Sequence, residues 1–249
     1  MLKVLIHNKG KSGSALRTAF GTNEDSLTAS IFQLLIYLPD NMLWDCIKQT
    51  LKNDKLPETV GRLEHIGFWE KWGVHGLPPH LAKKVGNNTY VEPDVLLVFE
   101  HFTMIIEAKR NDFGGQDSNQ WDREIILYYN QYCDNDYTIN KKPVLWALGG
   151  INNWSKKPRT IEQTDFQIVK STWTMLLSTI KSMALKSNVP QMQRLLEDLK
   201  EAFNFHGFFV GTWFYEARFE KQDIQDSSLD YFIKNKEKYD SQNWLFTLP

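Results

Sequence analysis

Residues 90–112 read YVEPDVLLVFEHFTMIIEAKRND. Two apolar runs, VLLVF and FTMII, flank a Glu-His pair, and this pattern predicts a β-hairpin that turns at the pair. In that register Asp94 on the first strand lies directly across from Glu107 on the second. Lys109 shares the face of Glu107 because side chains alternate along a strand. The hairpin is therefore expected to bring two carboxylates and one amine together at its open end.

This group of side chains suits metal-dependent chemistry. Two carboxylates that face each other repel and destabilise a bare sheet, and one lysine offsets only part of that repulsion. A divalent cation would offset the rest, and Mg²⁺ takes one or two carboxylates while water and phosphate oxygens fill its other positions. A neighbouring lysine can steady the attacking water or stabilise developing negative charge. The set therefore favours hydrolysis of a phosphodiester.

The register leaves an alternative open. Glu100–His101 is not a favoured two-residue turn, and a slip of one residue would turn Asp94 to the other face. The group would then be an ordinary salt-bridge cluster at the end of a hairpin. The apolar flanks favour the functional interpretation, since charges embedded in buried strands need a reason.

Composition sets the broad class of protein. The 249 residues are 42% hydrophobic and 13% aromatic, which indicates a folded protein with room for a large core. The formal net charge of -1 excludes a global positive field, so any nucleic-acid contact must come from a local patch. Cys46 and Cys133 are the two cysteines and lack zinc-site spacing. Without a signal-like or membrane-spanning apolar run, the chain is expected to be cytoplasmic and to have no membrane partner.

The order of expected elements is helix, three strands, helix, strand, then mostly helix. Thr22 and Asp25 resemble a capping box at the start of the first helix, whose apolar stripe is Leu27, Ile31, Leu34, Leu35 and Leu38. The stretch 73–88 is rich in Gly, Pro and Asn and is expected to be a loop. The pattern predicts helices over 22–38, 41–52, 117–132, 172–184 and 190–203, and strands over 62–72, the hairpin, 142–148 and 164–170.

At this point the sequence resembles a known superfamily. Pro93–Asp94 followed by Glu107–Ala108–Lys109, with twelve residues between the acids, is similar to the motif of the PD-(D/E)xK, or restriction-endonuclease-like, nucleases. The resemblance covers about residues 22–150. It implies an α/β fold with a mixed β-sheet core flanked by helices, within a single domain 1–249 whose C-terminal extension, 151–249, is mostly helical.

The resemblance also implies roles for the motif residues. Asp94 and Glu107 would hold Mg²⁺, for which Mn²⁺ could substitute, and the Ala108 carbonyl is a candidate ligand. Lys109 would act with the attacking water.

Two further residues are candidates with an alternative each. Glu24 falls near the centre of the apolar stripe of the first helix, and related nucleases often take one more metal-binding acid from that helix; a first-turn glutamate is also favoured by the helix dipole alone. Gln120 matches a glutamine that related nucleases place near the catalytic lysine, or else it closes a capping box with Asp117. Related lineages carry Tyr four residues after that glutamine, and here the position is Glu124.

Basic residues near the hairpin are candidates for phosphate contacts, with solvated loops as the alternative for each. Trp154 is a candidate for stacking on a base. The basic candidates are Lys83, Lys84, Arg110, Lys156, Lys157 and Arg159.

The expected function is therefore Mg²⁺-dependent hydrolysis of DNA, which in this superfamily often serves restriction or phage defence. Such small nucleases often work as homodimers or with a protein partner. One alternative is a catalytically silent nuclease-fold binding module or subunit of a larger complex. Another is an unrelated α/β enzyme with an accidental motif, which the position of Asp94 relative to Glu107 would distinguish.

Overall fold

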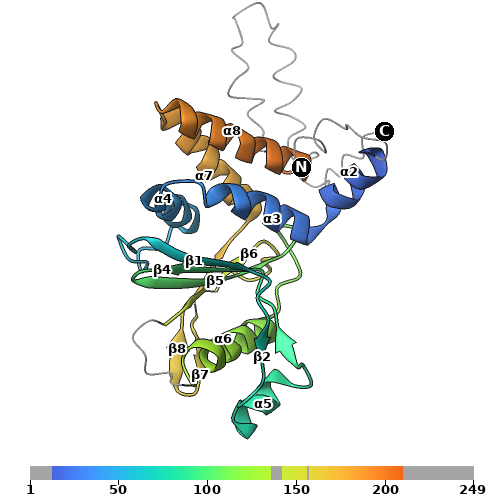
Figure 1. The fold of residues 1–249 in the computed structure, drawn as a ribbon, viewed down its shortest axis with the longest axis vertical. Coiled ribbons are helices and arrows are strands. Elements are labelled where there is room, and N and C mark those ends of the chain that lie inside the picture. The colour runs from blue at the N-terminus through green and yellow to red at the C-terminus, as the bar shows by residue number, and fades with distance from the viewer. Residues whose placement is uncertain (1–12, 136–141, 156, 210–249) are drawn as a thin grey trace, which may run out of the picture. The chain divides into compact units, whose positions relative to one another are not determined.

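The computed structural model describes residues 13–135, 142–155 and 157–209. A five-stranded sheet in the order β1-β4-β5-β6-β9 runs through this part of the chain (Figure 1). Strands β1, β4 and β5 are antiparallel, whereas β5, β6 and β9 run parallel. The expected mixed sheet is confirmed. Its strands are β1 (Leu63–Phe68), β4 (Val95–Phe99), β5 (Phe102–Ala108), β6 (Val144–Leu148) and β9 (Ile168–Ser171).

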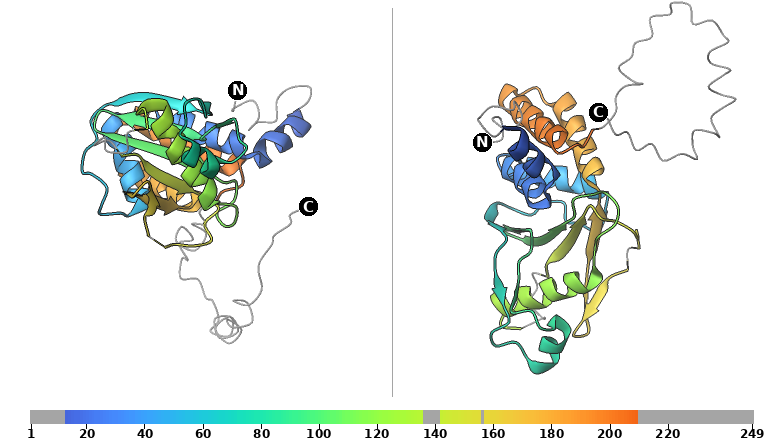
Figure 2. Two further views of the ribbon diagram at one scale, coloured as in Figure 1. Left: turned by 90° about the horizontal axis from the view of Figure 1, so that it is seen from below. Right: turned by 90° about the vertical axis from the view of Figure 1, so that its right-hand side faces the viewer.

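Helices cover both faces of the sheet (Figures 1 and 2). One face carries α3 (Glu24–Leu35), α4 (Asp40–Leu51), α7 (Trp173–Lys186) and α8 (Pro190–Phe205). The other carries α6 (Ser118–Tyr132). Smaller elements complete the described chain: α2 (Gly13–Thr22), α5 (Pro79–Val85), and the two-stranded ribbons of β2 (Trp72–Gly73) with β3 (Tyr90–Val91) and of β7 (Arg159–Ile161) with β8 (Thr164–Phe166).

Helix α3 presents Glu24 in its first turn. Its N-cap is Asn23, whose side chain accepts a hydrogen bond from the Ser26 amide at 2.8 Å, so the expected Thr22–Asp25 capping box is wrong. Thr22 instead ends α2 and donates its hydroxyl to the Thr18 carbonyl. The apolar stripe is buried as expected at four of its five positions, Leu27, Ile31, Leu35 and Leu38, while Leu34 is half-buried.

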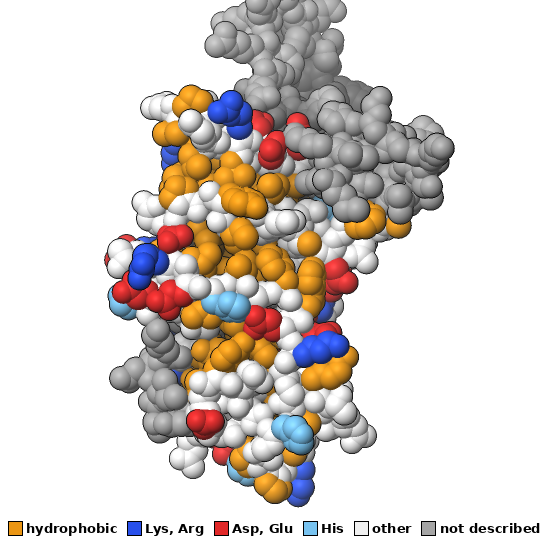
Figure 3. Space-filling model, viewed as in Figure 1, with side chains coloured by type: hydrophobic (Ala, Val, Ile, Leu, Met, Phe, Trp, Pro, Cys, Tyr) orange, Lys and Arg blue, Asp and Glu red, His pale blue; other side chains and the backbone are white. Residues whose placement is uncertain are grey.

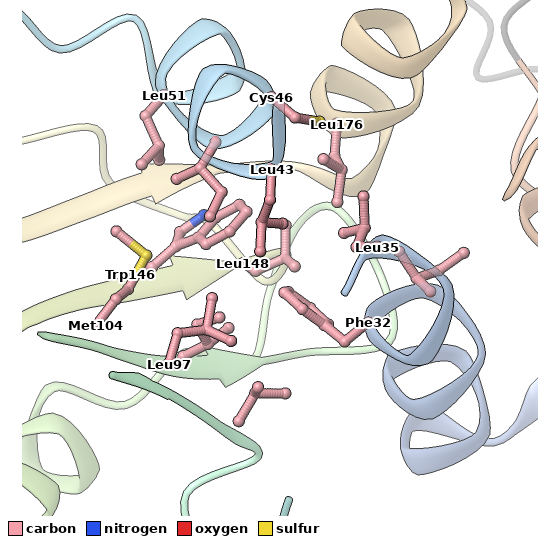
Figure 4. Close-up of a cluster of buried hydrophobic side chains, with 14 of the residues drawn as sticks. Phe32, Leu35, Leu43, Cys46, Leu51, Leu97, Met104, Trp146, Leu148 and Leu176 are labelled. Atoms are coloured by element: carbon pink, nitrogen blue, oxygen red, sulfur yellow. The ribbon is translucent and has the colours of Figure 1, made fainter. Parts of the chain in front are cut away.

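The sheet separates two hydrophobic clusters. Phe32 of α3 lies edge-on to Trp146 of β6 and Trp173 of α7, at 6.0 and 6.4 Å between ring centroids. Figure 4 shows this cluster between the sheet and the helices. The second cluster lies under α6 and includes Ile105 of β5 and Ile125. Because β5 and β6 are buried on both faces, their sequences are continuous apolar runs.

The central hairpin has the expected register. Phe99 pairs with Phe102 and Val95 with Ile106, so the turn is Glu100–His101. The amides of both turn residues donate to carbonyls of the preceding segment, Glu100 to Arg62 and His101 to Val60, each at 2.9 Å. These bonds from outside the hairpin stabilise a turn that its own residues do not favour.

Three local expectations are corrected by the structure. The stretch 73–88, expected to be a loop, contains α5, which begins with Pro79 at a position where its missing N–H costs nothing. The expected strand 62–72 is interrupted at Trp69, whose φ of 50° is left-handed. The expected strand 164–170 is present but divided: 164–166 forms β8 of a two-stranded ribbon, and β9 supplies the fifth strand of the sheet.

Beyond residue 150 the expected helices are present as α7 and α8. Residues 210–249 lie outside the described part. Within that part, no helix has the length and apolar character that a membrane crossing requires. On the face shown in Figure 3, hydrophobic side chains gather along the middle of the molecule.

Candidate metal and phosphodiester site

The predicted cluster forms at the open end of the hairpin. Asp94 directly precedes β4, and its Oδ2 accepts the Ala108 amide at 2.7 Å. Lys109 Nζ forms an ion pair with Glu107 Oε1, which is itself almost fully buried. Since the Val95–Ile106 pair lies next to them, the register places Asp94 across from Glu107. The structure therefore brings Asp94, Glu107 and Lys109 together.

Burial governs the electrostatics of the two acids. It raises the pKa of Asp94 to about 7, and the negative charge of Glu107 adds to the rise, while the Ala108 amide and Lys109 oppose it. Burial also raises the pKa of Glu107, against the opposing effect of Lys109. The site therefore disfavours two free negative charges unless a cation compensates them.

Lys109 is held as a cation. Burial alone would lower its pKa, but the charge of Glu107 and the hydrogen bond to it raise the pKa on balance, with help from Glu24 and Asp94. Its stem is confined by Gly150, since a β-carbon there would lie 2.8 Å from Lys109 Cβ. The Lys109 carbonyl accepts the indole N–H of Trp173 at 2.7 Å.

Glu24 is brought to the site, as the nuclease resemblance implies. Its Oε2 accepts the Arg110 amide at 2.6 Å, and its Oε1 lies 3.7 Å from Lys109 Nζ. The first turn of α3 thus contacts the segment that follows β5. A role limited to the helix dipole would not require these contacts.

Sequence reasoning missed three residues that contact the Asp94–Glu107 site. Trp69 donates its indole N–H to Asp94 Oδ1 at 3.1 Å. Gln116 Nε2 donates to the Glu107 carbonyl at 2.9 Å and to the Gly149 carbonyl at 3.2 Å. Gln116 Oε1 in turn accepts the Trp121 indole N–H at 2.7 Å. The glutamine that contacts the backbone of the motif is therefore Gln116, whereas the sequence had singled out Gln120.

Glu124 on α6 is the third missed residue. It is 1% exposed, and in the described part of the chain neither carboxylate oxygen has a regular hydrogen bond, although the Gln120 amide and the Glu107 carboxylate lie beside it. Burial raises its pKa well above the usual range, and the neighbouring charge of Glu107 raises it further, while the amide of Gln120 opposes the rise. Its spacing from Trp121 and Tyr128 placed it on the buried face of the helix, which was a usable signal.

Gln120 itself lies in the first turn of α6, beside Glu124 and one turn before it. Asp117 is the N-cap of the helix, as expected, and its side chain accepts the Asn119 amide. The Gln120 contact with Glu124 keeps it near the site without placing it on Lys109.

Three of the six basic candidates have other partners. The guanidinium of Arg110 donates to the Gly21 and His206 carbonyls at 3.0 and 2.5 Å and lies over the Phe208 ring, so it joins helices and is not open to a phosphate. Arg159 forms a bidentate ion pair with Asp122. Lys84 pairs with Glu162 at 3.2 Å.

The remaining candidates differ in position. Lys83 and Lys84 lie on α5, at the end of the molecule away from α3 (Figure 1). Lys157 is exposed, and Lys156 lies outside the described residues.

The donor set fits a metal that takes few protein ligands. Across the described ranges, no group of three or more His, Cys, Asp or Glu side chains is arranged to hold a metal ion. Asp94 and Glu107 offer two buried carboxylates, which is the number that Mg²⁺ usually takes from a protein. The raised pKa of each acid is the second sign of a fit, since a cation would relieve it.

Comparisons with known proteins identify a relative but no function. No family model and no solved structure matches the chain. The "Uncharacterized protein PM0110" of Pasteurella multocida (strain Pm70) is 30% identical over 260 aligned positions, which cover 96% of this chain and 93% of the relative. At this identity and coverage, the chain belongs to the same protein family as PM0110.

Proposed function

We propose that this chain is a Mg²⁺-dependent nuclease with a restriction-endonuclease-like core, and that it hydrolyses phosphodiester bonds of DNA. The observation that carries the proposal is the meeting of Asp94, Glu107 and Lys109 at the end of β4 and β5. The larger elements follow the order α3, α4, β1, β4, β5, α6, β6, and apart from the added helix α4 this order agrees with the core that the motif implies.

Each residue has a role that its surroundings support. Asp94, Glu107 and the Ala108 carbonyl would hold Mg²⁺, and the first of these is oriented by Trp69 and the Ala108 amide. When bound, Mg²⁺ supplies positive charge that offsets the charge developing on the phosphate oxygens. Glu24 positions Lys109 and the Arg110 amide.

Lys109 acts as a cation and not as a base. Its raised pKa keeps the ammonium protonated at neutral pH, so it cannot accept a proton from water there. It can instead donate hydrogen bonds to the attacking water or to a phosphate oxygen. Its confinement by Gly150 fixes the stem from which the ammonium extends.

A cleavage assay tests the proposal directly. Plasmid and single-stranded DNA are incubated with the protein in Mg²⁺ or Mn²⁺, beside Asp94→Ala, Lys109→Ala and an EDTA control. Lys186→Ala, an exposed lysine at the end of α7, is the matched control for the loss of one positive charge.

The expected result is cleavage by the wild type and by Lys186→Ala, with a loss of roughly 100-fold or more in the two site variants, as for removal of one transition-state donor. Equal cleavage by all four proteins would assign the activity to a contaminant. Absence of cleavage by folded wild type would favour the silent binding module.

A further inference from the structure

Two neighbouring hollows extend from the candidate site toward the edge of the sheet. The first has a volume of about 440 Å³ and lies between the start of α6 and the segment 151–159. The second, of about 430 Å³, lies between that segment and the end of α4. Both are lined by Ser155, Pro158 and Lys170, so they lie side by side, and the two together are named the Trp154 groove.

The near end of the groove adjoins the candidate site. Gln116 lines the first hollow and also donates to the Glu107 carbonyl. A β-carbon on Gly150 would lie 3.0 Å from Gln116 Cγ and 2.8 Å from Lys109 Cβ, so these side chains are packed together. A chain lying in the groove would therefore leave it beside Lys109.

Along the two hollows together, lysines outnumber acids. Lys52, Lys55 and Lys157 are exposed, and the described ion pairs do not use them. Lys170 donates to the Asn153 carbonyl at 2.6 Å, lies over the Trp121 ring, and lines both hollows. Two carboxylates, Asp54 and Asp165, oppose the four lysines, and Asp165 already accepts the Thr160 hydroxyl.

Trp154 is the aromatic side chain of this groove that remains open to solvent. It is 49% exposed and lines the second hollow together with Lys52 and Lys55. An exposed indole among lysines is the arrangement by which proteins bind single strands, since bases stack on the ring while cations meet the phosphates. Bases within a duplex are already stacked on one another and cannot reach such a ring.

We propose that the Trp154 groove binds a single strand of nucleic acid, with a base stacked on Trp154 and its phosphates on Lys52, Lys55 and Lys157. The inference rests on the proposed nuclease function for its direction, because the strand runs along the groove to the Asp94–Glu107 site. Binding itself needs no metal and no cleavage.

The test is binding measured in EDTA by fluorescence anisotropy, with labelled 15-mers of deoxythymidine and of uridine, and a 15-bp DNA duplex. Trp154→Ala should weaken binding of the single strand about 5-fold to 150-fold, the range seen for loss of one stacked base. Lys52→Ala/Lys55→Ala should reduce the slope of log affinity against log salt by roughly 1.4, from the loss of two phosphate contacts to a single strand. Tyr37→Ala, another exposed aromatic residue, and Lys186→Ala are the controls and should bind as the wild type does.

Each outcome decides the matter. Three results would overturn the proposal that the groove binds a strand: unchanged binding by Trp154→Ala, no binding by the folded wild type, or an equal loss of binding in the controls. Duplex binding with the same dependence on Trp154 would overturn the assignment to single strands. The deoxythymidine and uridine arms distinguish DNA from RNA as the source of the strand.

A further variant separates this inference from the nuclease proposal. Asp94→Ala should retain strand binding in EDTA. If the groove binds single strands and no form of the protein cleaves them, the nuclease proposal fails, while the proposal that the groove binds single strands is retained.

Discussion

Replacing Asp94 by Asn should stabilise the metal-free protein at alkaline pH while removing a carboxylate that we propose as a metal ligand. Burial raises the pKa of Asp94 from 3.8 to about 7. A carboxyl whose folded pKa is raised binds protons more readily in the folded than in the unfolded chain, so stability falls as pH rises between about 4 and 7. Asn carries no charge and is free of this loss.

The magnitude follows from the width of that window. Between pH 5 and pH 7 the wild type loses about 1.4 kcal/mol in its free energy of unfolding for each of the two pH units. The free energy of unfolding of Asp94→Asn, relative to wild type, should therefore rise by about 3 kcal/mol from pH 5 to pH 8. The side-chain amide can still accept the Ala108 N–H but not also the Trp69 indole, which costs about 1–3 kcal/mol at every pH and leaves the difference unchanged.

Urea unfolding in EDTA at pH 5, 6, 7 and 8 measures the difference. Asp25→Asn, an exposed acid in the same first turn as Glu24, is the matched control and should change by less than about 1 kcal/mol at any pH. A constant or falling advantage for Asp94→Asn would mean that the carboxylate ionises in the folded chain without penalty. The folded chain would then need no cation to compensate this carboxylate.

Three other substitutions test the supporting structure. Glu124→Gln keeps a donor that can face Glu107, so its rate of cleavage should stay within about tenfold of the wild type. Glu124→Ala should lower the rate roughly 10-fold to 100-fold. Equal rates for wild type and Glu124→Ala in a plasmid cleavage assay would exclude a supporting role for Glu124. Gly149→Ala should lower the free energy of unfolding by at least about 2 kcal/mol, because φ is 71° and the new carbon would lie 2.4 Å from the Lys109 carbonyl oxygen. Gly73→Ala, with open space around it, is the control in the same urea titration. Arg110→Ala leaves the Gly21 and His206 carbonyls without their donor and should cost about 1–3 kcal/mol, and an Arg110→Lys variant that restores full stability would show that charge alone suffices.

The hairpin was predictable because its register follows from pairing rules. Once Glu100–His101 is taken as the turn, every pair from Phe99–Phe102 to Val95–Ile106 is fixed. The apolar stripe of α3 was predictable for a similar reason, since helical periodicity alone selects its buried face.

The supporting residues were not predictable because they depend on contacts distant in sequence. Trp69 reaches Asp94 only through a left-handed backbone that breaks the expected strand. Gln116 precedes α6 and acts on two carbonyls that the sheet brings side by side, those of Glu107 and Gly149. The sequence suggested that Arg110 contacts a phosphate, but its guanidinium donates to carbonyls in α2 and at the end of α8.

The burial of Glu124 argues against a salt-bridge cluster as the whole explanation of the site. An ion pair between Lys109 and Glu107 accounts for two of the charged groups. It gives no reason for a third acid, 1% exposed, next to Glu107. Apolar residues of similar size usually stabilise a core as well as buried charges do, so a chain under selection for stability alone would gain by replacing it. An excess of acids over bases suits a site that must hold a divalent cation. Without the cation, the same excess lowers the stability of the folded chain, and the Asp94→Asn titration measures that loss.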